Sequence, residues 1–165
     1  MVADLSLLTL GAAGSTITWA SSKEEIVLPN GFVNRPAYPA TAVEVILTAS
    51  ITMGAELVEK AFTVTVIPTA ATDADLLREA EIALSEESIR NANLNLDQVN
   101  SDLVLPVLGL HGCSIAWSSS KGEVVSASGL VSKPDYRTGT TQVVLTATLR
   151  KGSEEIQKFF TVSVI

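Results

Sequence analysis

The sequence predicts a mainly β protein: two tandem β-sandwiches joined by a linker that contains one short α-helix. Three observations lead to this prediction. Residues 3–67 recur as residues 101–165, short runs of alternating apolar and polar residues lie between turn residues, and one segment has no counterpart in the repeat. Alternation with a period of two is typical of strands with one buried face. Such strands at intervals of about 8–12 residues indicate a sandwich rather than strands alternating with helices.

The repeat aligns without a gap, and about 29 of roughly 65 aligned pairs are identical. Its most recognisable stretch is Thr16–Lys23, which returns as Ser114–Lys121. In each copy an isoleucine and a tryptophan lie two positions apart, so both side chains point to the same face of a strand. We therefore expect Trp19 and Trp117 to be the largest side chains of two separate cores.

Both copies predict the same succession of strands. In the first copy the predicted strands are 5–10, 15–21, 25–28, 32–34, 43–52 and 57–67. In the second copy they are 103–108, 114–119, 123–126, 129–132, 142–149 and 156–165. Asn30 and Gly31 tolerate positive φ at both turn positions and predict a hairpin. Pro36 ends the pairing that follows, because proline lacks the N–H that a ladder needs.

The segment 68–100 has no counterpart in the first copy. A cap at Thr72 or Asp73 and apolar residues at near-helical spacing predict a helix over about 73–85. Residues 89–99 alternate again and predict a first strand for the second module.

The predicted domains are accordingly module one over 1–67, a linker over 68–88 with the helix, and module two over 89–165. A second module that begins near residue 73 is the alternative. Module one lacks this leading helix and strand, so we expect it to have an unpaired sheet edge.

Composition limits the classes of function. The 165 residues are 47% hydrophobic and carry a formal net charge of -7, which favours a folded protein and argues against nucleic acids and anionic membranes as partners. No apolar run is long enough for membrane insertion. The one cysteine, Cys113, excludes an intrachain disulfide. The first residues lack the regions of a signal peptide, and we expect the chain to be part of a longer protein that carries any leader and anchor.

No pattern predicts catalytic, cofactor-binding or metal-ligating residues, so we expect that the protein is not an enzyme and has no cofactor. His111 lies in a predicted loop and is replaced by Ala13 in the first copy. The serines 118–120 lack a nucleophile elbow and a second histidine. Four acidic residues lack the calcium-loop pattern and are expected on the solvated face of the helix: Asp73, Asp75, Glu79 and Glu81.

Three aromatic residues are the candidates for ligand contact: Tyr38, Tyr136 and Phe32. Each tyrosine lies two positions after a proline in a predicted loop, where its ring is suited to stacking on a sugar or a protein partner. Covering the end of the sandwich is the alternative use of the two tyrosines.

Spaced residues of the second copy form a longer pattern: Leu103-Val-Leu-Pro106, Gly109, Gly112, Ile115, Trp117-Ser-Ser-Ser120, Gly129-Leu-Val131, Pro134, Leu145-Thr-Ala147, Gly152 and Phe160-Thr-Val162. This pattern resembles that of the bacterial immunoglobulin-like modules called atrophied bacterial Ig domains. The helix with Leu96-Asp-Gln-Val99 resembles the leading segment of that family, whereas the first copy departs from the pattern at Leu8. The resemblance implies two tandem immunoglobulin-like sandwiches, no catalytic residue, and an extracellular or cell-surface location.

The predicted function is a non-catalytic extracellular spacer, stalk or adhesion module of a larger bacterial surface or secreted protein. Its expected partners are the neighbouring modules of that protein. Two alternatives remain open. The chain is an accessory module of a secreted polysaccharide-degrading enzyme that binds a glycan, a cell-wall polymer or a protein. Or it is a self-assembling unit, in which like modules exchange the segment 89–99 through an edge strand.

Overall fold

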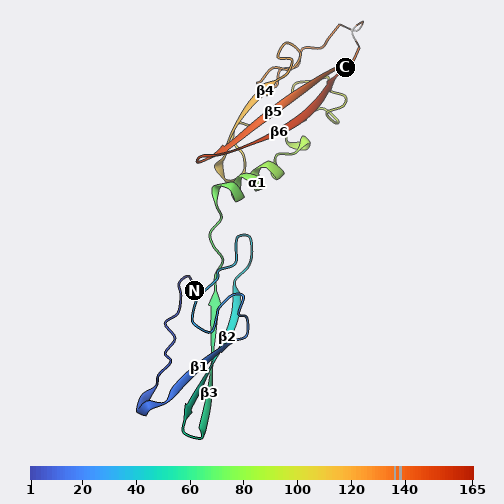
Figure 1. Ribbon diagram of the computed structural model, residues 1–165. Coiled ribbons are helices and arrows are strands. Elements are labelled where there is room, and N and C mark those ends of the chain that lie inside the picture. The colour runs from blue at the N-terminus through green and yellow to red at the C-terminus, as the bar shows by residue number, and fades with distance from the viewer. Residues whose placement is uncertain (136, 138) are drawn as a thin grey trace. The chain divides into compact units, whose positions relative to one another are not determined.

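The computed structural model describes residues 1–135, 137 and 139–165 and divides into two compact units, Met1–Ala71 and Thr72–Ile165. Each unit contains one three-stranded antiparallel sheet (Figure 1). The predicted fold class is confirmed, with a mainly β chain, two repeated modules, and helix between them in the sequence. The elements are η1 (Ala12–Gly14), β1 (Thr16–Ser21), β2 (Val43–Met53), β3 (Glu56–Val66), α1 (Asp73–Ala83), α2 (Glu86–Ile89), η2 (Leu110–Gly112), β4 (Ser114–Ser119), β5 (Thr141–Lys151) and β6 (Glu154–Val164).

The longest elements form two hairpins, β2–β3 and β5–β6, in which each strand has 11 residues. Their turns begin at Gly54 and Gly152, whose φ angles of 61° and 56° are left-handed, as a tight hairpin turn requires. β1 joins β2 with Trp19 opposite Ala49, and β4 joins β5 in the same register. The alternation in the sequence therefore becomes an inward and an outward face of each sheet.

The shorter predicted strands do not form hydrogen-bonded ladders, so these predictions were wrong in detail. They lie at 5–10, 25–28, 32–34, 103–108, 123–126 and 129–132. The chain there is held by isolated bridges, such as Val27 with Val33, and by single bonds, such as Leu5 N to Gly31 O at 2.8 Å. Their backbone groups bond singly to different segments, as Ile17 N does to Thr9 O and Asn34 N to Ile26 O, so no pair of segments shares enough successive bonds for a ladder. Their buried valines still pack on the sheet, so these segments form the second layer of each module.

The strand predicted over 89–99 was also wrong, because only Val99 pairs there, in an isolated parallel bridge with Val164. Ile89 ends α2, and the following turns surround the side chain of Asn93, which is 3% exposed. In the first unit Met1 takes the place of Val99, since its carbonyl accepts a hydrogen bond from Ile67 N at 3.2 Å.

The two cores differ in extent. In the first unit the buried core residues are Val27, Val33, Val45, Leu47 and Val66. In the second unit the corresponding core continues into the helices through Leu77, Ala80, Leu84 and Ile89. Neither tryptophan is fully buried, and the largest fully buried side chains are leucine and isoleucine. The expectation that tryptophan is the largest core side chain was therefore wrong: each ring covers the margin of its core.

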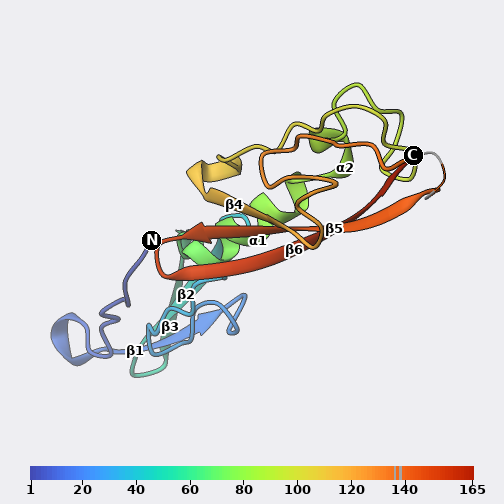
Figure 2. The same cartoon turned by 90° about the horizontal axis from the view of Figure 1, so that it is seen from above.

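The helix α1 lies in the second compact unit, whereas the predicted domains placed it in a linker over 68–88 and the alternative placed it at the start of module two, near residue 73. It packs against β5, β6 and η2, and Figures 1 and 2 show it alongside the two strands. Thr72 caps its first turn together with Asp75, and the buried Leu77 explains why the helix docks on the sheet. Within the described residues, no helix has the length and apolar character needed to cross a membrane.

Candidate functional site

The aromatic candidates lie on the loop segments of their modules. Phe32 is 52% exposed, in a turn whose backbone is fixed by Leu28 N, which donates to Phe32 O at 3.0 Å. Tyr38 is half-buried, and its backbone N–H donates to Thr69 Oγ1 at 3.4 Å. Tyr136 lies outside the described residues. The role of all three in ligand contact remains a prediction.

His111 has a partner that the sequence did not suggest. Its Nε2 lies 2.7 Å from Glu79 Oε2, so the pair connects α1 to η2. Lys151 Nζ donates to the backbone oxygen of His111 at 2.8 Å, which fixes the loop from the other side. No group of three or more metal-ligating residues occurs in the part of the chain that the structure describes. The arrangement therefore holds a helix in place and offers no nucleophile or metal ligand set.

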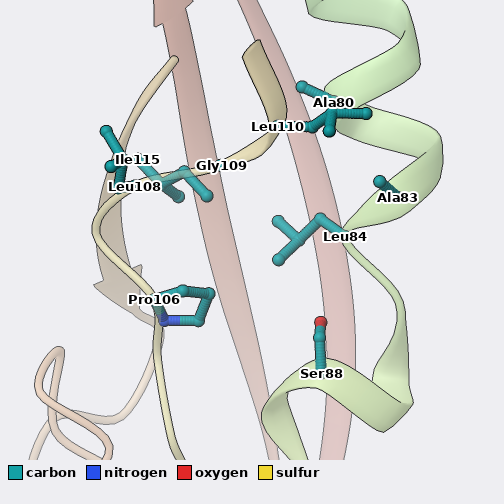
Figure 3. Close-up of a pocket in the computed structure, with 9 residues that line it drawn as sticks. All are labelled: Ala80, Ala83, Leu84, Ser88, Pro106, Leu108, Gly109, Leu110 and Ile115. Atoms are coloured by element: carbon teal, nitrogen blue, oxygen red, sulfur yellow. The ribbon is translucent and has the colours of Figure 1, made fainter. Parts of the chain in front are cut away.

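A hollow of about 240 Å³ separates α1 and α2 from the segment that precedes β4. Figure 3 shows Ala80, Ala83 and Leu84 on one side and Pro106 and Ile115 on the other. The only side-chain heteroatom among its lining residues is the hydroxyl of Ser88, which donates to Ser85 O. Such a hollow has no acid, base or charge with which to bind a polar substrate.

The first unit has a larger, apolar groove of about 310 Å³ on the inner face of its sheet. We call it the module-one groove, and its lining residues are Ser6, Leu7, Leu8, Ile17, Trp19, Ala49, Ile51, Lys60 and Phe62. Lys60 is its only charged residue, and its Nζ lies 5.1 Å from the centre of the Phe62 ring. The groove can therefore bind an apolar surface that presents one electronegative group.

The same face is closed in the second unit, where α1 lies on it. Phe160, the counterpart of Phe62, is 5% exposed, whereas Phe62 is 40% exposed. Lys158, the counterpart of Lys60, donates from Nζ to Glu81 O at 2.7 Å, near the end of α1. The two faces thus share their side chains and differ in whether a helix covers them.

Sequence reasoning missed the module-one groove because its residues are typical of a core. One feature of the sequence does point to it. In β3 and β6 the inward positions alternate with outward ones, and a lysine occupies an inward position in both copies, as Lys60 and Lys158. A charge on the inner face of a sheet needs a partner there. In the second unit that partner is a helix carbonyl.

Comparison with known families agrees with this geometry. The family model of the atrophied bacterial Ig domain matches residues 1–69 and 79–165, which are two segments consistent with two copies. A comparison with curated proteins finds no match.

Proposed function

Because the chain belongs to the atrophied bacterial Ig domain family, we propose that it is a non-catalytic spacer or stalk within a larger bacterial surface or secreted protein. One observation carries the proposal. The residues that the two modules share build the fold. Asp4, for example, accepts a hydrogen bond from Val33 N at 2.8 Å, and Asp102 accepts the same bond from Val131 N.

The residues that differ between the copies support the same conclusion. The polar pair of the second module, His111 with Glu79, has only Ala13 at the histidine position of the first. Phe32, a candidate for ligand contact, is replaced by Leu130 in the second module. A repeated spacer needs a repeated fold but no repeated site, and its partners are then the neighbouring modules of the same protein.

An extracellular location is tested by labelling the native bacterium with antibodies raised against this chain. Binding to intact cells, or recovery of the protein from the culture medium, is the expected outcome. Labelling that requires lysis of the cells contradicts the proposal. Mild proteolysis of intact cells, followed by detection of the released modules, gives an independent readout of surface exposure.

A glycan-binding accessory module is the second candidate, and it is favoured by the exposed ring of Phe32. A glycan and cell-wall polymer array, probed with the wild-type chain and with Phe32→Ala, separates it from the spacer. Binding that the substitution abolishes supports the accessory module. An array without binding supports the spacer, and Leu130→Ala serves as the matched control at the equivalent exposed position.

A further inference from the structure

The module-one groove has the features of a helix-binding face, and the second unit shows how such a face is used. There Leu77 of α1 and Ile156 of β6 line one pocket, while Ala80 and Leu84 lie across from Ile115 in another. Leu77 and Ala80 of α1 and its C-cap residue Leu84 are all buried. The inner face of this kind of sheet therefore accepts an amphipathic helix with a narrow apolar stripe.

The first unit presents the same face in a conserved shape. Ile17 and Phe62 are identical to their counterparts, and Ile51 and Val58 replace leucine and isoleucine, which changes the face by one methylene or less. Val58 is 63% exposed, and Phe62 is 40% exposed. Large apolar side chains that gather on one exposed face mark an interaction surface.

The hairpin turns also show that a helix covers the sheet face of the second unit and not that of the first. In the second unit a Cβ placed on Gly152 would lie 2.3 Å from Oδ2 of Asp73, the first residue of α1. At Gly54, the equivalent turn of the first unit, no atom of the described residues other than the glycine and its two chain neighbours lies within 4 Å of such a Cβ. The space that the start of the helix occupies in one module is therefore open in the other.

The position of Lys60 indicates how a bound helix would be oriented in the groove. Lys158 donates to the carbonyl of Glu81 in the last turn of α1, where helix carbonyls lack partners and carry partial negative charge. Lys60 occupies the same inward position and is exposed. A helix that enters the module-one groove would place its carboxyl end at Lys60.

The α1 of a second copy of this chain does not supply such a helix. Each chain holds one α1, and that helix already fills the groove of its own module. An exchange of α1 between two copies would fill one groove by emptying another, so the number of filled grooves would not change. An additional helix is required.

We propose that the module-one groove binds the leading helix of a further Ig-like module: an amphipathic helix with apolar residues spaced as Leu77, Ala80 and Leu84, and with its carboxyl end at Lys60. The helix needs no acid at the position of Glu79, because the first module has Ala13 where His111 would bind it. This site would join successive modules by a docked helix. The binding of this helix does not depend on an extracellular location.

The test uses the full chain and a synthetic peptide of residues 72–100, labelled with a fluorophore. Saturable binding is expected by anisotropy, and a peptide with Leu77→Asp and Leu84→Asp is expected not to bind. In the chain, Lys60→Glu should weaken binding about fivefold or more, because it reverses the charge at the helix carboxyl end. Lys23→Glu makes the same charge change at an exposed position outside the groove and should leave binding unchanged.

A second measurement locates the peptide without a substitution in the groove. The chain has two tryptophans, so Trp117→Phe leaves Trp19, which lines the groove, as the only one, and the peptide contains none. A blue shift of Trp19 emission on titration is expected. The proposal is overturned if the peptide does not bind, if Lys60→Glu and Lys23→Glu bind it equally, or if Trp19 does not respond. It is also overturned if sedimentation shows a dimer of the chain that the peptide cannot dissociate.

Discussion

Each tryptophan joins three parts of its module. The ring of Trp117 packs on Phe160 with 5.8 Å between centroids, and its Nε1 donates to Pro106 O at 2.8 Å. Trp19 makes the same two contacts, with Phe62 at 5.7 Å and with Leu8 O at 2.9 Å. The indole therefore ties the segment before the sheet to the sheet itself. A phenylalanine would keep the packing and lose the hydrogen bond from Nε1.

The matched tryptophans allow a comparison within one chain. We expect Trp117→Ala to lower the free energy of unfolding of its module by about 3–5 kcal/mol, as removal of a large packed ring does. Trp19→Ala should cost about 2 kcal/mol, because the ring beneath it is 40% exposed and less apolar area is lost from burial. Urea titrations followed by circular dichroism measure both. Equal losses would contradict the inference that the exposure of Phe62 and the burial of Phe160 set the cost.

Asn93 is the residue on which the segment 89–99 depends. Its Nδ2 donates to Arg90 O and to Ser101 O, both at 2.9 Å. Its Oδ1 accepts from Asn100 N at 2.9 Å and from Ser101 N at 3.1 Å. One buried amide thus satisfies backbone groups on both sides of the turn. We infer that this side chain, rather than strand pairing, sets the course of the chain here.

Replacing Asn93 should be costly for a residue outside any strand. In Asn93→Leu the backbone groups around it stay buried without partners, and we expect the free energy of unfolding of the second unit to fall by about 1–3 kcal/mol. Gln98→Leu is the control, since it makes the same amide-to-leucine change at an exposed position of the same segment. Chemical denaturation of both variants gives the comparison. A control that costs as much as Asn93→Leu would show that the network is not the cause.

At the scale of elements, α1 begins with a reciprocal cap. The Thr72 hydroxyl accepts from Asp75 N at 3.2 Å, and the Asp75 carboxylate accepts from Thr72 N at 3.0 Å and from its hydroxyl at 2.7 Å. These bonds, the one from the Thr72 side chain first, hold the pKa of Asp75 below its ordinary value of 3.8. They favour the charged form, which also suits the amino end of a helix.

This cap predicts a pH dependence. Because the pKa of Asp75 is lower in the folded chain than in the unfolded one, its contribution to stability is fully present above pH 3.8 and is lost as the pH falls through the folded value. Asp75→Asn should therefore destabilise the second unit at neutral pH, and its difference from wild type should shrink in acid. Asp97→Asn controls for the change in net charge. Thermal unfolding at several pH values measures the difference, and a gap that does not change with pH would contradict the prediction.

Long periodic elements were predictable from the sequence, and short ones were not. The hairpins and α1 follow from sustained alternation and from the helical spacing before Leu84. The extended segments do not, because their bonds come from distant side chains such as Asp4, which binds Val33 N. Residues 89–99 do alternate between apolar and polar, but the hydrogen bonds of the buried Asn93 side chain replace strand pairing there. Structural context of this kind overrides the preference that the alternation indicates. The prediction of the fold class was still correct, because the long strands form most of each sheet.

At the scale of the whole molecule, two copies of one sequence pattern give two unequal units. The candidate site could not be predicted from the residues that line it, since Phe62 and Phe160 are the same residue in the same pattern. What differs is the segment 72–100, which supplies Leu77, Leu84 and Ile89 to one core only. Burial is thus decided by a segment far from the residue that is buried. That segment was visible in the sequence as the part without a counterpart.

The unequal cores predict that the two units unfold at different urea concentrations, the first unit before the second. Less apolar area leaves water when the first unit folds, because Phe62 and Val58 stay exposed and no helix adds to its core. Trp117→Phe and Trp19→Phe each leave one tryptophan, so fluorescence follows one unit at a time. The midpoint reported by Trp19 should lie below that reported by Trp117.

Adding the 72–100 peptide should raise the Trp19 midpoint alone, because a ligand that binds only the folded state stabilises it. Coincident midpoints without peptide would contradict the inequality of the cores, and a peptide that shifts only the Trp117 midpoint would place its site in the wrong module.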